Sequence, residues 1–221
     1  MEEFLGILFC GGRGARLGEI TKYISKSFIP VYDTPVFKFG LKLLENSKSI
    51  GEIIILTNNE NDEAFQQTGY KTIIQDDSRV NDMLSGWEFI KEVTQTRKHG
   101  VLVPGDNICE VRIDKLIEKF RKTNADFLFS LHRLKDKKKL AEMGSFDIKK
   151  NKFYYKNLKT KSKYGVIAPY IIKNNSETGT GKNIFESENT EIVKHKGYWF
   201  DIGGYDSLIE AGNWRQKNKP V

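Results

Sequence analysis

The feature that most constrains the fold is an alternation of apolar runs with amphipathic segments over the first 131 residues. The first apolar run, Phe4–Cys10, stops abruptly at Gly11-Gly12-Arg13-Gly14, as a buried strand that enters a tight turn does. Strands that alternate with helices are typical of an α/β fold whose mostly parallel sheet carries helices on both faces. The predicted strands after the first are Glu52–Thr57, Lys71–Gln75, Val101–Pro104 and Phe127–Leu131, and the predicted helices are Phe37–Glu45, Met83–Val93 and Ile113–Phe120.

The sequence after residue 131 is less regular. Asn174–Asn183 is rich in Asn, Ser, Thr and Gly, which predicts a loop, and a last helix is predicted from Asp206 or Ser207, as N-cap, to about Arg215. The 221 residues exceed the commonest domain size but are few for two cores, so we expect one domain over residues 1–221. The expected short strands are Phe153–Tyr155, Gly165–Ile172 and Ile192–Val193.

The composition excludes several classes of protein. Hydrophobic residues make up 38% of the chain and aromatic residues 12%, which is too much apolar material for a disordered chain. No apolar run approaches the roughly 18 residues that cross a bilayer, and Met1-Glu2-Glu3 is acidic where a secretion signal is positive, so we expect a cytoplasmic protein with no membrane partner. Cys10 and Cys109 are too few for a disulfide framework or a structural zinc site. His132 and His195 have no spaced partner and are interpreted as surface or core residues.

The charge balance suits phosphorylated ligands or nucleic acid. Lys and Arg number 36 against 29 Asp and Glu, which gives a net charge of +7. The basic runs Lys135–Lys139 and Lys149–Lys163 lie close to Tyr154, Tyr155 and Tyr164, a pattern that a nucleic-acid surface can use. Basic runs are more often solvated faces, so nucleic acid is not the favoured partner.

The glycine-rich segment after the first strand is the first candidate site. Gly11, Gly12 and Gly14 allow a sharp turn that brings main-chain N–H groups close to a polyphosphate, while Arg13 and Arg16 supply positive charge. We interpret the segment as a phosphate cradle. It differs from the dinucleotide-binding fingerprint, because the next glycine comes one residue too late for G-x-G-x-x-G. A plain tight turn is the alternative, although it needs neither so many glycines nor two arginines.

A second segment adds a lysine and two prolines to this motif. Lys26 is followed by Pro30-Val31-Tyr32-Asp33-Thr34-Pro35. With the glycine-rich loop, this segment resembles the sugar-1-phosphate nucleotidyltransferases, most closely the glucose-1-phosphate thymidylyltransferases. The resemblance implies a Rossmann-like nucleotidyltransferase fold with a mixed, mostly parallel central sheet and helices on both faces. It also implies that Arg16 and Lys26 hold the triphosphate and the departing pyrophosphate, where fixed cations stabilise phosphoryl charge.

Two acidic residues are the candidate metal ligands. Asp106, in Gly105-Asp106-Asn107, directly follows a predicted strand, where the open edge of an α/β sheet places its ligand site. A carboxylate there suits Mg²⁺, which prefers oxygen ligands, and a turn begun by Asp is the alternative. The family has a similar segment after the corresponding strand. Asp201, in Trp199-Phe200-Asp201-Ile202-Gly203, matches a family segment that implies a second Mg²⁺ ligand.

The resemblance also implies contacts to the base and to the sugar. Gln75, at the end of a predicted strand, aligns with a glutamine that reads the base, and an amide can both donate to and accept from a pyrimidine. The next residues, Asp76–Asn81, depart from the family pattern, which leaves dTTP, UTP and CTP open. Lys159 is the predicted contact of the sugar phosphate, and Gly144 is a predicted neighbour of the sugar.

These motifs predict an enzyme that transfers a nucleotidyl group from a nucleoside triphosphate to a sugar 1-phosphate and releases pyrophosphate. The attacking phosphate is already an anion, so no side-chain nucleophile is needed. Two other functions stay open. One is a catalytically inactive protein that binds a nucleotide or a sugar phosphate. Departures from the family pattern at Leu158 and Thr160, on either side of Lys159, and at Arg79–Asn81 would suit that function. The other is a basic nucleic-acid binder. Subunit number stays open as well, with a homo-oligomer as one option.

Overall fold

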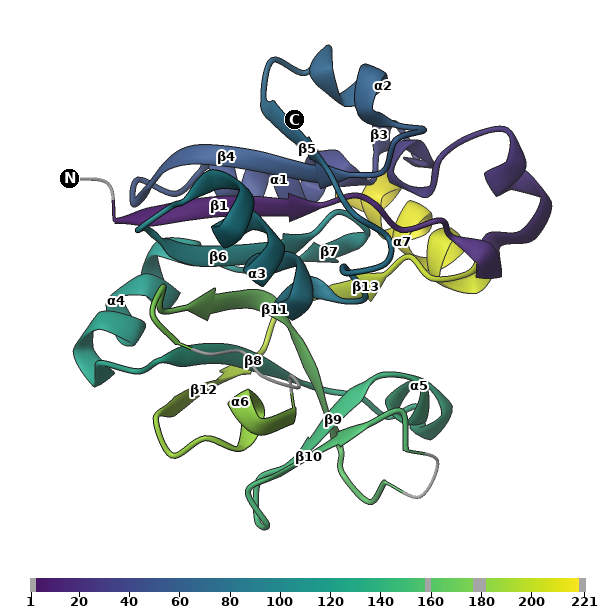
Figure 1. Ribbon diagram of the computed structural model, residues 1–221. Coiled ribbons are helices and arrows are strands. Elements are labelled where there is room, and N and C mark those ends of the chain that lie inside the picture. The colour runs from purple at the N-terminus through teal and green to yellow at the C-terminus, as the bar shows by residue number, and fades with distance from the viewer. Residues whose placement is uncertain (1–2, 158–159, 177–181, 219–221) are drawn as a thin grey trace.

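The protein folds around a mixed β-sheet that helices cover on both faces (Figure 1). A computed structural model describes residues 3–157, 160–176 and 182–218. The predicted fold, a mixed and mostly parallel sheet with helices on both faces, is confirmed. Within the described residues the nine strands of this sheet are β1 (Phe4–Phe9), β4 (Ile50–Thr57), β5 (Lys71–Ile74), β6 (His99–Pro104), β8 (Phe127–Arg133), β9 (Gly144–Asp147), β10 (Lys152–Tyr155), β11 (Tyr164–Ile172) and β12 (Thr190–His195).

The sheet has a parallel half and a mixed half. Its main path runs β10-β9-β11-β6-β1-β4-β5, and β8 lies between β11 and β12. Strands β6, β1, β4 and β5 pair in parallel, as the strand and helix alternation of the first half predicts. The antiparallel pairs involve β11 and the β9–β10 hairpin. That hairpin joins β11 through a single residue pair, Ser145 with Gly165.

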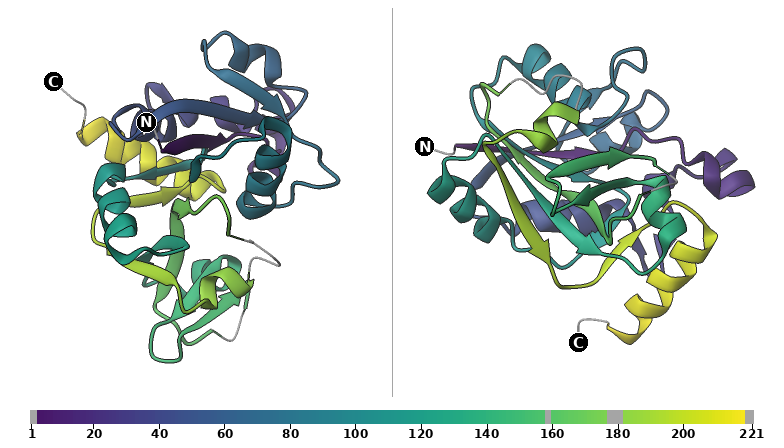
Figure 2. Two further views of the ribbon diagram at one scale, coloured as in Figure 1. Left: turned by 60° about the vertical axis from the view of Figure 1, so that its left-hand side comes forward. Right: turned by 90° about the horizontal axis from the view of Figure 1, so that it is seen from below.

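The helices lie on both faces and at the ends of the sheet. Three of them, α1 (Phe37–Glu45), α3 (Met83–Thr94) and α4 (Ile113–Thr123), form where the sequence predicts helices. In two views α2 lies at one end of the molecule and the β9–β10 hairpin at the other (Figures 1 and 2). None of the helices in the described part of the chain is long and apolar enough to cross a membrane. The other helices are α2 (Asp62–Gln66), α5 (Lys137–Glu142), α6 (Lys182–Glu186) and α7 (Tyr205–Lys217), with 3₁₀ turns at Ala15–Lys22 and Lys26–Phe28.

Alternate residues of β1 supply the cores on the two faces of the sheet. Leu5 and Ile7 pack in one buried cluster with Trp87 of α3. Phe4 and Leu8 pack in a second cluster, which α1 and α4 cover. Side chains alternate between faces along a strand, so this one apolar run can bury both of its sides. A strand buried on both faces reads as continuous apolar sequence, which is why β1 is visible in the sequence.

Two short antiparallel ladders lie outside the main sheet. One pairs β2 (Pro30–Val31) with β3 (Thr34–Pro35). The other pairs β7 (Asn107–Cys109) with β13 (Trp199–Asp201). The second ladder places Asn107 opposite Asp201, 94 positions further along the chain, and it shapes the site described below.

The last helix begins earlier than its predicted N-cap. The N-cap is Gly204 rather than Asp206 or Ser207, and α7 runs on to Lys217. The prediction was wrong because Ser207 occupies the third helical position, where its hydroxyl accepts a hydrogen bond from the Gly204 N–H at 3.3 Å.

The structure corrects one further expectation and adds a contact that the sequence did not predict. The predicted loop Asn174–Asn183 is cut short because α6 begins at Lys182, while residues 177–181 lie outside the described residues. His132 and His195, interpreted as surface or core residues, contact each other with their Nδ1 atoms 2.8 Å apart. The parallel pairing of β8 with β12 sets these two residues opposite each other, and a local sequence pattern cannot reveal such a register.

Gly40 is a point where α1 lies close to the sheet, which makes it a test of the packing. A Cβ there would lie 2.9 Å from Cδ1 of Leu8 and 3.1 Å from the carbonyl oxygen of Pro104. We expect Gly40→Ala to lower the free energy of unfolding by about 1–3 kcal/mol, because overpacking outweighs the roughly 1 kcal/mol that alanine gains over glycine in a helix. Urea denaturation followed by circular dichroism measures the change.

Gly212 in α7 is the matched control. The nearest atom to a Cβ at that position is the backbone nitrogen of Tyr32, at 4.0 Å. Gly212→Ala should therefore raise the free energy of unfolding by up to about 1 kcal/mol. An equal gain from Gly40→Ala would contradict the close packing of α1 on the sheet.

Candidate active site

Two loops leave the sheet side by side because β1 and β6 are parallel neighbours. Phe9 at the end of β1 pairs with Pro104 at the end of β6. The next residue, Gly105, donates its N–H to the Phe9 carbonyl oxygen at 2.8 Å. A Cβ on Gly105 would lie 2.5 Å from Sγ of Cys10, so a glycine is required for this approach. The glycine-rich loop and Asp106 therefore begin at the same edge, at the carboxyl ends of parallel strands.

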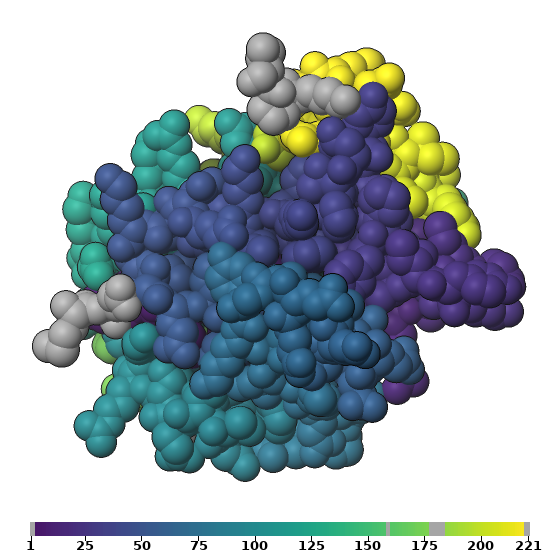
Figure 3. All heavy atoms as spheres, turned by 90° about the horizontal axis from the view of Figure 1, so that it is seen from above, coloured from purple at the N-terminus to yellow at the C-terminus, as the bar shows by residue number. Residues whose placement is uncertain are grey.

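The loop after β1 projects from the body of the protein beside α7 (Figure 3). Gly14 turns it with a left-handed φ of 67°, and a Cβ there would lie 2.9 Å from Cβ of Lys26. Gly12, Arg13, Ser25 and Lys26 help to line a cavity of about 420 Å³ beside the loop. Among the described residues nothing hydrogen-bonds the buried hydroxyl of Ser25. A buried hydroxyl and two cations beside glycines suit a phosphate ligand.

Asp106 and Asp201 converge on the same side chain. The amide Nδ2 of Asn107 donates to Oδ1 of Asp106 at 2.9 Å and to Oδ1 of Asp201 at 3.3 Å. The Ile202 N–H donates to the Asp106 carbonyl oxygen at 2.9 Å, which ties the two loops together through the backbone. The two predicted acids are therefore brought together, across the β7–β13 ladder.

The predicted cations face these acids. Lys26 is 9% exposed and forms an ion pair with Asp106. The guanidinium of Arg16 lies against Gly203, where a Cβ would be 2.7 Å from Nη2. Burial, together with the neighbouring Asp106, raises the pKa of the Asp201 carboxyl, although Lys26 and Arg16 act in the opposite direction. Asp106 and Asp201 thus lie close to each other, and positive charge nearby is needed to stabilise both in their ionised form.

The predicted base-reading residue is held beside the glycine-rich loop. A Cβ on Gly11 would lie 1.9 Å from Oε1 of Gln75, so the amide fills the space that glycine leaves open. Nε2 of Gln75 donates to Asp77 at 2.6 Å, and Nη2 of Arg13 donates to the other oxygen of Asp77 at 2.8 Å. These bonds lower the pKa of the Asp77 carboxyl. Asp77 belongs to the segment that departs from the family pattern, and it links Gln75 to Arg13.

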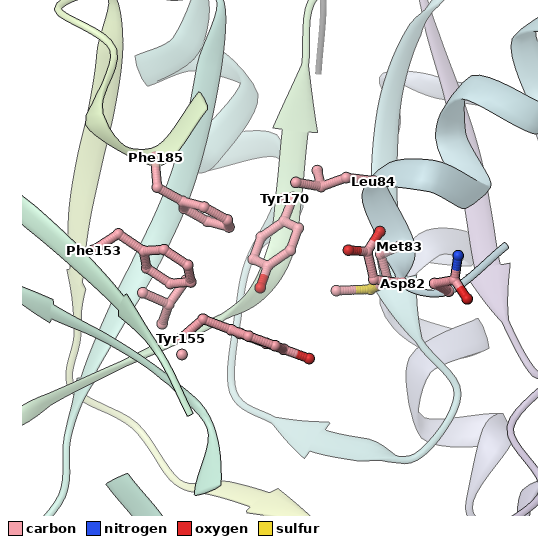
Figure 4. A pocket seen from close by; sticks show the side chains of 10 residues that line it. Asp82, Met83, Leu84, Phe153, Tyr155, Tyr170 and Phe185 are labelled. Atoms are coloured by element: carbon pink, nitrogen blue, oxygen red, sulfur yellow. The ribbon is translucent and has the colours of Figure 1, made fainter. Parts of the chain in front are cut away.

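A second cavity, of about 450 Å³, is walled mainly by aromatic and aliphatic side chains (Figure 4). Phe153 and Phe185 stack with ring centroids 4.3 Å apart, and Tyr170 lies between them and the first turn of α3. Gly144, predicted beside the sugar, lines this cavity, and a Cβ there would lie 2.7 Å from the Phe153 ring. Lys159, the predicted contact of the sugar phosphate, lies outside the described residues.

Sequence reasoning missed several side chains at the site. Asn58 directly follows β4, and its buried amide donates to the Gly11 carbonyl oxygen at 3.3 Å. Its place after a predicted strand, next to the strand of the glycine-rich loop, is a signal that could have identified it. Asn107 and Trp199 lie within the motifs that contain Asp106 and Asp201, but their contacts depend on the register of β7 with β13.

The acids fit a magnesium ion that is shared with a substrate. Across the described residues no three His, Cys, Asp or Glu side chains gather as a metal site of their own. Mg²⁺ in phosphoryl-transfer sites is usually held by one or two carboxylates, with waters and substrate phosphates as the other ligands. Two converging carboxylates such as Asp106 and Asp201 match that donor set.

A glycine-rich loop, paired carboxylates and cations at the carboxyl edge of an α/β sheet are typical of enzymes that act on phosphorylated nucleotides. Residues 5–151, more than half of the chain, match the family model of nucleotidyl transferases. The protein belongs to the nucleotidyl transferase family, which confirms the resemblance read from its motifs.

Curated relatives match over part of their length. The glucose-1-phosphate thymidylyltransferase of Neisseria gonorrhoeae is 40% identical over 62 residues, which is 28% of this chain and 21% of that protein. The 2-C-methyl-D-erythritol 4-phosphate cytidylyltransferase of Chlamydia pneumoniae is 31% identical over 80 residues, 36% of each protein. The matches thus span about a fifth to a third of the relatives' lengths.

Solved structures match nearly the whole chain. A Bacillus anthracis structure described as a glucose-1-phosphate thymidylyltransferase in complex with sucrose has a TM-score of 0.83 at 20% identity, and the match covers 99% of this chain and 97% of that one. The UTP-bound UGPase from Acinetobacter baumannii has a TM-score of 0.78 at 13% identity, with 98% and 95% covered. At these identities the likeness shows a shared fold.

The raised pKa of Asp201 predicts a stabilising substitution. The folded protein holds the Asp201 proton more tightly than the unfolded chain, so this group's contribution to stability is lost as the pH rises above the ordinary value of 3.8. We expect Asp201→Asn to raise the melting temperature at pH 7 by about 2–4 °C, the shift that about 1 kcal/mol produces in a chain of this size.

The gain in melting temperature should shrink as the pH falls toward 3.8, because the carboxyl then becomes protonated in the unfolded state as well as in the folded state. Scanning fluorimetry between pH 4 and 8 measures it. Asp206→Asn, which removes an exposed acid from the first turn of α7, should give no gain. A lower melting temperature of Asp201→Asn at pH 7 would mean that the surrounding cations outweigh the burial.

Proposed function

We propose that this protein transfers a nucleotidyl group from a pyrimidine nucleoside triphosphate, namely dTTP, UTP or CTP, to a sugar 1-phosphate. The observation that carries the proposal is the convergence of Asp106 and Asp201 beside Lys26 and Arg16 at the carboxyl edge of the parallel strands. The names of its relatives, which include a glucose-1-phosphate thymidylyltransferase and a cytidylyltransferase, support a pyrimidine nucleoside triphosphate as the donor substrate.

In the proposed reaction an oxygen of the sugar 1-phosphate attacks the α-phosphorus of the triphosphate. A new phosphorus–oxygen bond forms, and the bond from the α-phosphorus to the bridging oxygen breaks. Pyrophosphate leaves with the electron pair of that bond. The nucleophile is already an anion, so the task of the protein is to align the two substrates and to neutralise their charge.

Each charged side chain has a place in this scheme. Lys26 and Arg16 would bind the leaving pyrophosphate, and the burial of Lys26 strengthens its interaction with a phosphate oxygen. Asp106 and Asp201 would hold Mg²⁺, which, when bound, neutralises charge on the α-phosphate. Lys26 would then exchange its Asp106 partner for a phosphate oxygen.

The aromatic cavity is the proposed site of the acceptor's sugar ring. Gly144 lines the wall of this cavity, two residues after Glu142. Oε2 of Glu142 lies 4.0 Å from Nη1 of Arg16, which supports a place for the cavity next to the cations of the site. Aromatic rings such as Phe153 and Phe185 can pack against the C–H groups of a sugar.

A pyrophosphate-release assay tests the function. Wild-type protein, incubated with each triphosphate, Mg²⁺ and a mixture of sugar 1-phosphates, should release pyrophosphate. Lys26→Ala and Asp106→Asn should each lower the turnover number by at least about 10²-fold, because each removes a fixed charge at the reacting phosphates. Circular dichroism spectra should stay unchanged.

Lys122→Ala is the matched control, since Lys122 is exposed in the last turn of α4, a helix on the opposite side of the molecule from α7 in Figure 1. It should leave the rate unchanged. Full activity of Asp106→Asn would contradict its assignment. Ligand binding without any pyrophosphate release would favour the inactive binding protein, and salt-sensitive binding to nucleic acid alone would favour the third function.

Tyr155 tests the acceptor cavity with little risk to folding, because it lines the cavity and is 65% exposed. Tyr155→Ala should raise the KM for the sugar phosphate about fivefold and leave the KM for the triphosphate unchanged, since one aromatic contact contributes about 1 kcal/mol. Tyr205→Ala, at the start of α7 and 48% exposed, is the control. Equal effects on both KM values would contradict the assignment of the cavity.

A further inference from the structure

We infer that Asn107 and Trp199 form a positioning pair that sets the orientation of the carboxylates of Asp106 and Asp201 for catalysis. The inference rests on the proposed function, because it assigns these two residues a role in presenting the acids to Mg²⁺ and the reacting phosphates. Neither residue of the pair is required to touch a substrate.

The hydrogen bonds of Asn107 use each of its polar atoms. Its Nδ2 donates to both carboxylates, at 2.9 Å and 3.3 Å, while its Oδ1 accepts the indole N–H of Trp199 at 3.0 Å. An amide has two N–H donors, so it can give one to each acid. One side chain thus connects both acids.

Trp199 decides which way this amide points. The indole N–H is a donor only, so it can bond to the oxygen of Asn107 but not to its NH₂ group. With the amide turned over, its oxygen would face two carboxylates and its NH₂ group would face the indole N–H. Both contacts would be repulsive, and the buried indole would lose its partner. The indole therefore excludes the wrong orientation.

Strand register builds the arrangement. In the β7–β13 ladder Asn107 lies opposite Asp201, and Trp199 is two residues before Asp201 on the same strand. Residues two apart on a strand project to the same face, so the indole and the carboxylate reach the amide from one side. Nζ of Lys139 lies 4.8 Å from the centre of the Trp199 ring, and the ring also packs against His132.

The arrangement leaves the second oxygen of Asp106 available to a cation. The amide of Asn107 takes Oδ1, and the ammonium of Lys26 already pairs with Oδ2. Two neighbouring carboxylates repel each other, so without a shared donor they would turn apart. The pair holds them together while leaving Oδ2 of Asp106 free to exchange its cation.

Trp199→Phe is the decisive variant, because it keeps an aromatic ring beside Lys139 and His132 and removes the N–H donor together with the second ring of the indole. We expect the Mg²⁺ concentration for half-maximal pyrophosphate release to rise about tenfold, the range seen when an outer partner of a metal ligand is lost. The turnover number should fall, while the KM for the sugar phosphate should not change. Titration of the free protein with Mn²⁺, followed by electron paramagnetic resonance, should show a similar loss of affinity.

Trp87→Phe is the matched control. The indole N–H of Trp87 is buried with no hydrogen-bond partner among the described residues, so its removal breaks no bond. This variant should keep the wild-type Mg²⁺ and Mn²⁺ dependence. Asn107→Asp is the second test, since it keeps an acceptor for the Trp199 indole and replaces the shared donor by a third carboxylate. It should lower the turnover number more than Trp199→Phe does.

The outcomes separate the inference from the function on which it rests. If wild-type protein releases no pyrophosphate with any triphosphate, the proposed function fails and the role of the pair falls with it. If wild-type protein is active and Trp199→Phe matches it in turnover and in Mg²⁺ and Mn²⁺ dependence, the inference alone is wrong. A change in melting temperature without a change in metal dependence would also overturn it, because that result indicates a purely structural bond.

Discussion

The parallel pairing of β1 with β6 is the constraint on which the site depends. It places the ends of the two strands, Phe9 and Pro104, side by side, so that the glycine-rich loop and Asp106 start within one residue of each other at the sheet edge. The hydrogen bond from Gly105 to Phe9 extends the pairing by one step past the strand ends. A side chain at position 105 would push the two loops apart, and Asp106 would then move away from the glycine-rich loop.

Electrostatics sets a second constraint on this edge. Burial, and after it the neighbouring Asp106, raise the pKa of Asp201, and the partly buried ion pair of Lys26 with Asp106 offsets part of the repulsion between the two acids. Such an arrangement opposes folding stability, and it suits the proposed ligand, which would carry both phosphates and a divalent cation. The site therefore has the features expected where function, rather than stability, determines the residues.

Sequence patterns predicted the parts of the structure that interactions between neighbouring residues determine. The apolar run of β1, the helical spacing of α1 and α3, and the glycines before Arg16 are visible because burial and turn geometry act over a few residues. Pairings between distant segments were not predictable from one sequence. The opposition of Asn107 and Asp201, the contact of His132 with His195, and the bond from Arg13 to Asp77 all depend on how strands or loops meet. The residues of the site could thus be predicted from the sequence, but the contacts that hold them in place could not.

The attachment of the β9–β10 hairpin through one residue pair has a consequence for how specificity can evolve. This hairpin supplies Gly144, Phe153 and Tyr155 to the aromatic cavity, whereas Asp106 follows β6, and Asp201 and Lys26 lie in elements outside the main sheet. Phe146 and Phe153 of this hairpin also belong to the buried cluster that contains Leu5 and Ile7 of β1, so most substitutions in its apolar face disturb the common core. The exposed Tyr155 is therefore the position in the hairpin where the compounds that are accepted can diversify at the lowest cost in stability.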